Sequence, residues 1–388
     1  MPLVAMEVMV RALAPRGSGV HDARRAGSGP RRRRRTLPAD DAALALLLQA
    51  PLLHYVAEAF ARTACARCLR LLGPEAPREA CGACGAAVWC SAACRAASEA
   101  DPLGHSRSAC RCARLLRESG LDAEARDAAR FLAVAYAAKR LRPDAFARFR
   151  GLEGGGPGGP APDVPVELVH RLLRMVFYAE APGLVAEGPG ESAELLAKEA
   201  LNAFALMAPN GPDGERRVKG GAVYAGLAMA NHECFPNAAR VDAPDGSLRM
   251  QLRALHALPA GSEILIGYFP LDWDFEDRQE RLRGDYGFEC RCPRCRLDLR
   301  FQRDSAYTGI APSGEACAPC DAGGEGGGEE VEATEGYLTM FLLKYLCPKE
   351  TGDCGGTMVP VAGTEWYQCN VCDLRRTEAD FLAEVEAL

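Results

Sequence analysis

The chain has 388 residues, 48% of them hydrophobic, which is enough to bury a sizeable core and suggests two or three domains. Its formal net charge of −6 gives no general affinity for nucleic acid, and no apolar run reaches the roughly 18 residues that a membrane span needs. The 18 cysteines stand in short pairs, which favours zinc sites in a reducing compartment over a secreted disulfide scaffold.

The first 64 residues are rich in Ala, Arg and Gly. Basic residues follow the apolar N-terminal stretch instead of preceding it, so we expect no secretory signal, while a transit peptide stays open. The tract Arg31–Arg35 is interpreted as a solvated loop, with a nuclear-localisation or acidic-partner patch as the alternative. The stretch LALLLQAPLLHYV, from Leu44, predicts a buried strand.

A cluster of cysteines and one histidine occupies residues 65–112. Its pairs have two or three residues between the thiolates, a spacing that lets both sulfurs reach one ion at about 2.3 Å. Eight ligands can fill two tetrahedral sites, and metal binding would then supply much of the folding energy of so small a module. The candidate ligands are Cys65, Cys68, Cys81, Cys84, Cys90, Cys94, His105 and Cys110.

Three segments after this cluster carry apolar residues at helical spacing, namely ARDAARFLAVAYAAKRL, VELVHRLLRMVFYA and SAELLAKEALNAFALM. The stretch GLEGGGPGGPAPDVP between the first two predicts a flexible loop. From about residue 221 the pattern changes, and SLRMQLRALHAL and EILIGYF predict two strands joined by a turn at PAG. The stretch GGEGGGEEVEATE predicts a disordered acidic linker.

The second half of the chain contains three motifs, which are, in chain order, NHECFPN (231–237), EILIGYF (263–269) and YGFECRCPRC (286–295). Together they resemble the SET domain and its post-SET zinc segment, and the 65–112 cluster resembles the MYND zinc finger. The combination resembles the split SET–MYND arrangement of protein-lysine methyltransferases over roughly two thirds of the chain. The resemblance implies an α+β fold, in which a β-rich SET fold with small sheets and a threaded-loop knot is split by the finger and a helical insert.

The resemblance also implies the domain organisation. Residues 1–64 are the N-terminal part of the SET domain with an Arg/Gly-rich insertion, 65–112 the MYND finger, 113–200 the helical insert, 201–270 the SET core, 271–300 the post-SET zinc segment, 301–335 a flexible acidic linker and 336–388 a zinc-ribbon-like module. Animal members often continue into a helical-repeat domain, which the last segment replaces here.

Four zinc sites follow. By resemblance the MYND pairs interleave, so Cys65, Cys68, Cys90 and Cys94 hold one ion, and Cys81, Cys84, His105 and Cys110 hold another. Four residues separate His105 from Cys110 where the family usually has three, and Cys112 is a nearby alternative. Cys234 is expected to join Cys290, Cys292 and Cys295 and so tie the threaded loop to the tail, with free core cysteines as the alternative.

The fourth site is predicted from CPKETGDC and CNVC, a zinc-ribbon pattern that supplies Cys347, Cys354, Cys369 and Cys372. The stretches GTMVPV and WYQ are expected to be its hairpin strands. Cys317 and Cys320 form one further pair, which would replace part of this set or remain free thiols.

The resemblance implies S-adenosylmethionine as cofactor and assigns roles by position. Asn231 and His232 contact its amino acid end, and Asn202 also binds the cofactor. Phe288 lies against its adenine, Gly17 and Gly19 form a Gly-rich loop beside it, Tyr268 is the catalytic tyrosine and Tyr286 lines the lysine channel. The alternatives are a structural knot for Asn231 and His232, a surface polar residue for Asn202 and a core aromatic for Tyr268.

The predicted function is S-adenosylmethionine-dependent methylation of a lysine side chain of a histone or non-histone protein. The alternative is a catalytically weak or inactive SET–MYND zinc scaffold, which the insertion HDARRAGSGPRRRRR behind the Gly-rich loop favours. A DNA-binding zinc protein is disfavoured by net charge and ligand spacing. We expect a monomer in the nucleus or cytoplasm with about four zinc ions, a proline-rich peptide partner at the MYND finger, no membrane association and no sequence-specific DNA binding.

Overall fold

The computed structural model describes residues 45–76, 78–154, 163–209, 211, 216–243, 247–259, 261–307, 335–348 and 354–386. The Gly-rich loop with Gly17 and Gly19, the Arg31–Arg35 tract and the pair Cys317 and Cys320 lie outside the described residues. None of the described helices combines the length and the apolar character that crossing a bilayer requires.

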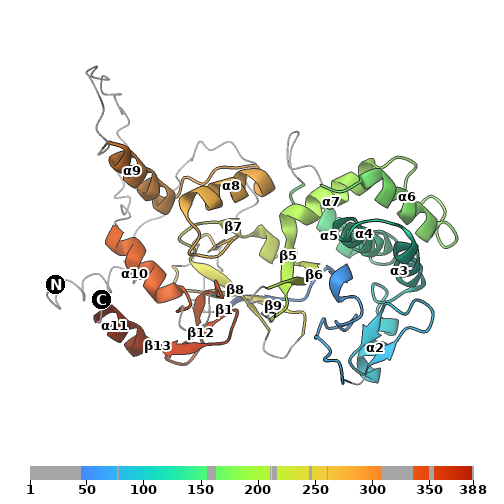
Figure 1. Cartoon of the computed structure of the whole chain (residues 1–388), viewed down its shortest axis with the longest axis horizontal. Coiled ribbons are helices and arrows are strands. Elements are labelled where there is room, and N and C mark those ends of the chain that lie inside the picture. The colour runs from blue at the N-terminus through green and yellow to red at the C-terminus, as the bar shows by residue number, and fades with distance from the viewer. Residues whose placement is uncertain are drawn as a thin grey trace, which may run out of the picture.

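Small sheets occupy the middle of the molecule, between a group of helices on one side and a C-terminal module on the other (Figure 1). The largest sheet has five strands in the order β1-β9-β8-β10-β7. Their bounds are β1 Ala45–Gln49, β7 Asn231–His232, β8 Ala238–Asp242, β9 Met250–Ala254 and β10 Leu265–Ile266. Strand β10 runs parallel to both of its neighbours, whereas β9 is antiparallel to β1 and β8. Of the predicted strand EILIGYF, Leu265 and Ile266 form β10.

A second sheet has the order β2-β6-β5, with β2 at Leu53–Val56, β6 at Val218–Val223 and β5 at Ala203–Met207. The prediction of one strand from Leu44 was wrong, because the segment forms β1 and β2 in two different sheets. The break falls at Pro51, which has no N–H to donate to a ladder and so separates the two strands.

Five helices make up the insert: α3 Arg107–Glu118, α4 Ala123–Leu141, α5 Pro143–Arg150, α6 Val166–Phe177 and α7 Gly190–Asn202. The small side chains of α4 let its neighbours approach closely, and Phe131 and Tyr136 are buried in the core they share. The N-terminus of α4 is capped by Asp122, which accepts from the backbone N–H of Ala125 at 2.8 Å.

The third helix predicted from the sequence was too long. It ends at Asn202, and the chain continues directly as β5, whose residues pair with β6 from Ala203 to Met207. Pairing with β6 outweighs the helical propensity of Ala, Leu and Met in this stretch. The switch from helix to strand places Asn202 at a junction of two elements.

The finger module contains β3 Glu79–Ala80, β4 Val88–Trp89 and α2 Ala92–Ala100, beside the short helix η1 at Glu58–Phe60. A second short helix, η2 at Leu227–Met229, precedes β7. The hydroxyl of Ser91 caps α2 by accepting from the backbone N–H of Cys94 at 3.2 Å. The cap thereby fixes the backbone that carries this cysteine.

The C-terminal part contains α8 Phe275–Tyr286, α9 Pro293–Tyr307, α10 Glu335–Tyr345, β11 Met358–Pro360, β12 Trp366–Cys369, β13 Arg375–Thr377 and α11 Glu378–Glu386. The predicted ribbon hairpin is confirmed, since β11 and β12 pair antiparallel. The prediction of a flexible linker from residue 301 was wrong in its first part, because α9 continues to Tyr307. The rest of the predicted linker, residues 308–334, lies outside the described residues.

Candidate active site and zinc centres

Cysteine and histidine side chains gather in four groups of four in the described part of the chain. Within each group the ligand atoms all lie within 4.8 Å of one another. In a regular tetrahedron with zinc–sulfur bonds of about 2.3 Å, neighbouring sulfurs lie about 3.8 Å apart. The sulfur pairs in these groups are separated by 3.6–3.9 Å, for example 3.8 Å between Cys68 and Cys90 and 3.7 Å between Cys354 and Cys369. The donor sets therefore fit about four zinc ions.

The two groups of the finger interleave along the chain. One consists of Cys65, Cys68, Cys90 and Cys94, and the other of Cys81, Cys84, His105 and Cys110. In the second group the Sγ of Cys84 lies 3.4 Å from Nε2 of His105. Trp89 is buried between these groups and the helices, with its ring 5.5 Å from that of His105.

Of Cys110 and its alternative Cys112, the structure places Cys110 in the ligand group. The Sγ of Cys110 lies 3.8 Å from that of Cys81, inside the ligand group. Cys112 points the other way on α3 and is buried in the core of the helical insert, where its Sγ lies 3.9 Å from the carbonyl of Ala129. Burial in this core raises the pKa of the Cys112 thiol, and its place among the helices, away from the other sulfurs, excludes it from the ligand group.

The third group joins the middle of the chain to the segment after α8. The Sγ of Cys234 lies 3.9 Å from that of Cys290 and 3.6 Å from that of Cys295, and Cys292 completes the set. Four thiolates around one Zn²⁺ carry a net charge of −2, which has to be offset in a buried place.

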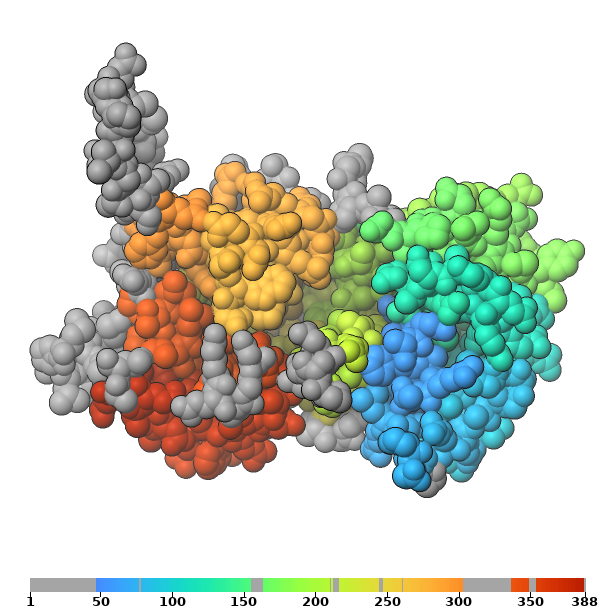
Figure 2. Space-filling view, viewed as in Figure 1, coloured from blue at the N-terminus to red at the C-terminus, as the bar shows by residue number. Residues whose placement is uncertain are grey.

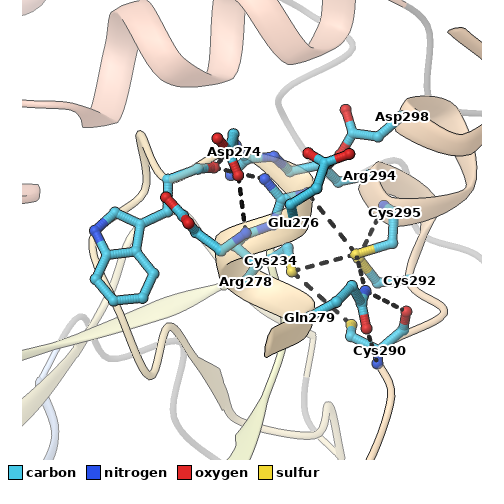
Figure 3. A network of polar contacts seen from close by, with 12 residues as sticks. Cys234, Asp274, Glu276, Arg278, Gln279, Cys290, Cys292, Arg294, Cys295 and Asp298 are labelled. Atoms are coloured by element: carbon cyan, nitrogen blue, oxygen red, sulfur yellow. Dashed lines mark hydrogen bonds and ion pairs between the residues drawn. The ribbon is translucent and has the colours of Figure 1, made fainter. Parts of the chain in front are cut away.

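Two side chains of α8 meet this need (Figure 3). The buried guanidinium of Arg278 donates to Cys295 Sγ at 3.9 Å and forms an ion pair with Asp298 on α9. Gln279 donates through Nε2 to Cys295 Sγ at 3.3 Å and to the carbonyl of Cys290 at 2.9 Å. Hydrogen bonds to metal-bound sulfur orient the ligands, so Arg278 and Gln279 belong to the metal centre although they cannot bind the ion.

Asn237, the last residue of NHECFPN, holds the threaded loop against β10. Its Nδ2 donates to the carbonyl of Glu263 at 2.8 Å, and its Oδ1 accepts from the N–H of Leu265 at 2.9 Å. Its own N–H donates to the carbonyl of Leu265 at 3.1 Å. One asparagine thus satisfies three backbone groups of the crossing segment. The sequence interpretation passed over Asn237, although a short motif with two asparagines was a signal for such a lock.

The ring of His232 lies between the third zinc group and the predicted catalytic tyrosine. Its Nδ1 accepts from the backbone N–H of Tyr268 at 3.2 Å, and its Nε2 lies 3.2 Å from Cys234 Sγ. Since Nδ1 is an acceptor, the proton resides on Nε2 and is donated to the sulfur. Burial lowers the pKa of His232 to about 3, which keeps the ring neutral.

Tyr268 and Tyr286 lie side by side in the lining of a cavity of about 360 Å³. Their ring centroids are 4.7 Å apart, and the hydroxyl of Tyr268 donates to the carbonyl of Ala230 at 2.9 Å. Much of the remaining lining near these rings is apolar, with Phe204, Leu227, Ala228 and Ile266 among the contributors. In Figure 2 the surface is hollowed between the orange helix α8 and the green segment that carries β5.

Asn202 also lines this cavity and is only 3% exposed. Its Nδ2 donates to the carbonyls of Glu153 at 2.7 Å and Lys198 at 2.6 Å, which fixes the amide. Its Oδ1 is buried and has no hydrogen-bond partner among the described residues. A buried acceptor without a donor is costly, and the ammonium of an amino acid group would supply one. The residues present therefore fit the amino acid end of S-adenosylmethionine.

Among the described residues, the predicted cofactor contacts Asn231, His232 and Phe288 do not line this cavity. Asn231 donates through Nδ2 to Glu263 Oε1 at 2.6 Å, so its side chain is engaged within the protein. The half-buried Phe288 lies with its ring centroid 6.4 Å from His232 and 6.5 Å from Tyr286. These residues lie around the segment that follows β10 and carries Tyr268. Their roles toward the cofactor remain predictions.

Most lining residues were not singled out by the sequence interpretation, and Phe204 and Ala230 are two that matter for the geometry of the cavity. Phe204 follows Asn202 by two positions and faces the cavity because β5, and not a helix, begins at Ala203. Ala230 supplies the carbonyl that holds the Tyr268 hydroxyl. A strand pattern in AFALM was the available signal for Phe204, whereas a backbone carbonyl leaves no signal in a sequence.

No family model matches the chain. It is 30% identical to Histone-lysine N-methyltransferase ASHR2 of Arabidopsis thaliana, over 84% of this chain and 88% of that protein. It is 32% identical to a SET and MYND domain-containing protein of Dictyostelium discoideum, over 28% of this chain and 26% of the other. It is 35% identical to N-lysine methyltransferase SMYD2 of Homo sapiens, over 24% and 21% of the two chains.

The first of these matches covers most of both proteins, and the Dictyostelium relative is named for the SET and MYND domains that the motifs of this chain predict. The chain belongs to the family of SET and MYND domain-containing protein-lysine methyltransferases.

Proposed function

We propose that this protein transfers a methyl group from S-adenosylmethionine to the side-chain nitrogen of a lysine in another protein. The observation that carries the proposal is the position of Tyr268, whose hydroxyl is held on the Ala230 carbonyl inside an aromatic-lined cavity. The relatives named as histone-lysine and N-lysine methyltransferases support the same reaction. The substrate is therefore a protein with a target lysine.

The cavity lining prepares the lysine for reaction. A lysine side chain that enters beside Phe204, Tyr268 and Tyr286 leaves water for the aromatic part of the cavity, while charged residues such as Arg281 and Asp285 line other parts of it. Desolvation disfavours the ammonium form, so the pKa of the amine falls and the neutral nucleophile becomes accessible. The two rings, 4.7 Å apart, also restrict the direction in which the chain can enter. Such alignment contributes several kcal/mol to a group-transfer step.

The hydroxyl of Tyr268 orients the amine. Its proton is donated to the Ala230 carbonyl, and a phenolic oxygen is also an acceptor, so we expect the lysine nitrogen to donate a hydrogen bond to it. A fixed acceptor at that point faces the positive charge that develops on the nitrogen during transfer. The His232 ring, bonded to the backbone N–H of Tyr268, keeps this strand end in place.

When bound, S-adenosylmethionine supplies a methyl group activated by a sulfonium. Asn202 would accept from its ammonium through the unpartnered Oδ1, and Phe288 would cover its adenine. Gly17 and Gly19 remain predicted contacts outside the described residues.

Radiolabelled methyl transfer to a fractionated lysate, followed by mass spectrometry, tests the proposal and identifies the substrate. We expect label on lysine of at least one protein and micromolar binding of the cofactor by calorimetry. If the protein neither binds the cofactor nor transfers a methyl group, that result would instead support a zinc scaffold.

We further propose that the protein acts as a monomer in the nucleus or cytoplasm and that its MYND finger takes a proline-rich partner. The support for a reducing compartment is that nearly all of the described cysteines stand in metal-ligand groups, which need reduced thiolates. Cell fractionation and size-exclusion chromatography test these points.

A further inference from the structure

The C-terminal zinc ribbon shares the cavity of Tyr268. The lining includes Cys354, Gly355, Thr357, Asn370 and Val371. They belong to the two ligand-bearing turns of the fourth zinc group, one at Cys354 and one between Cys369 and Cys372, which we call the ribbon knuckles. These residues lie more than eighty positions after Tyr268 in the sequence. The cavity is therefore enclosed by two modules, the SET core on one side and the ribbon on the other.

Asn370 joins the two modules at this place. Its Nδ2 donates to the carbonyl of Arg240 on β8 at 2.9 Å, and its Oδ1 accepts from the backbone N–H of Thr357 at 2.8 Å. The N–H of Asn370 also donates to the carbonyl of Thr357 at 3.0 Å. One side chain thus fixes both knuckles relative to the strand that borders the cavity.

The contact between the modules is close and apolar elsewhere. Gly355 has φ of +57°, and a Cβ at this position would lie 3.4 Å from the ring of Pro270, two residues after Tyr268. Leu255 and Leu271 of the SET part pack with Phe341, Tyr345 and Val359 in one buried cluster. The hydroxyl of Tyr345 donates to the carbonyl of Leu255 at 3.2 Å. A ribbon held in this way forms a fixed wall.

We propose that the ribbon knuckles form one wall of the site that receives the substrate segment flanking the target lysine. Asn370 positions this wall, and Val371 limits the size of the flanking residue that fits beside it. The inference rests on the proposed methyl transfer. The occupant follows from continuity, since the same cavity extends from Tyr286 at the lysine end to Val371 at the ribbon.

Two variants of the full-length protein test the wall. Asn370→Asp keeps an acceptor for the Thr357 N–H but loses the donor to the Arg240 carbonyl, and Val371→Trp narrows the cavity. The control is Gln368→Ala, because Gln368 lies on the same ribbon, contacts Asp373 and Arg375, and does not line the cavity. The probe is a degenerate peptide library with a fixed central lysine.

Both variants are expected to raise KM for the peptides that the wild type prefers by at least about tenfold, with kcat and cofactor affinity within about twofold. Val371→Trp is further expected to shift the preference toward smaller flanking residues, while Gln368→Ala behaves as wild type. Unchanged KM and unchanged preference in both variants would overturn the inference. A variant that loses its ribbon zinc remains informative, because removal of the wall must then raise KM as well.

Failure of the proposed function gives a different result. A wild-type protein that binds no cofactor and methylates no library peptide contradicts the methyltransferase itself, whereas an active wild type with insensitive variants contradicts only the role of the ribbon.

Discussion

His232 and Cys234 are joined by a hydrogen bond of 3.2 Å between Nε2 and Sγ. The other ring nitrogen of His232 accepts from the backbone N–H of Tyr268. A single imidazole therefore links the third zinc group to the strand end that carries the predicted catalytic residue. Because the zinc ligand is a hydrogen-bond acceptor here, the ring has one fixed tautomer and one orientation.

Replacement of His232 by alanine should loosen both ends of this link. We expect the zinc affinity of the third group, measured by competition with a chromophoric chelator, to fall about 10- to 100-fold. Hydrogen-bond partners of metal ligands contribute on this scale. Methyl transfer should fall in parallel. The control is His256→Ala, because the His256 ring bonds to the carbonyl of the neighbouring Ala257 and belongs to none of the four ligand groups. Equal zinc retention in both variants would argue against the link.

Tyr268→Phe should lower kcat by about 10²- to 10³-fold, the scale seen when one fixed polar group is removed from a reacting centre. Cofactor affinity should change little, because the hydroxyl contacts the Ala230 carbonyl at the lysine end of the cavity. Steady-state kinetics and calorimetry check the two expectations. Tyr178→Phe, at a side chain that is 78% exposed, is the matched control. A Tyr268→Phe enzyme as active as wild type would refute the role of the hydroxyl.

Cys110 and Cys112 differ in their expected effect on zinc content. Cys110→Ala should reduce the metal by one ion from about four per chain, because it removes a ligand from a group of four. Cys112→Ala should leave the metal content unchanged and cost about 1 kcal/mol of folding stability through lost packing in the helical core. Elemental analysis of the two purified variants decides the assignment, and loss of zinc on Cys112→Ala would reverse it.

The ligand groups could be anticipated because most of their members are close in sequence, so spacing alone limits what two thiolates can reach. Cys110 was predicted by resemblance and is confirmed, but the exclusion of the nearby Cys112 depends on which face of α3 packs against α4, which spacing does not show. The β5 strand was also missed, since its residues favour a helix until β6 is present to pair with them.

The hydrogen-bond partners of the third zinc group could not be predicted from the sequence either. Arg278 and Gln279 occupy a strongly polar helix whose pattern indicates a surface. They are buried only because α8 packs over the four sulfurs. The ribbon contact of Asn370 with β8 joins segments 130 residues apart, and no local pattern predicts such a distance. Tertiary packing decides all of these features.

Glu199 on α7 should make stability depend on pH. Burial raises the pKa of its carboxyl from 4.5 to about 7, and the hydroxyl of Tyr55 donates to its Oε1 at 3.3 Å. Between these two pH values the folded protein retains the proton that the unfolded chain releases, so stability falls as pH rises through this window. The full deficit, reached above pH 7, is at most about 3 kcal/mol and is reduced by solvent screening.

Glu199→Gln keeps an acceptor for the Tyr55 hydroxyl and removes the titration. We expect its apparent Tm to exceed that of wild type by a few °C at about pH 8.5 and the difference to shrink toward about pH 6, given roughly 2–4 °C per kcal/mol. Thermal melts across this range, in which the thiolate sites should retain zinc, provide the measurement. Glu194→Gln on the same helix is the control, because its carboxylate is exposed and pairs with Arg150 at the surface. A Tm difference for Glu199→Gln that is constant with pH would show that the carboxyl does not titrate in this window.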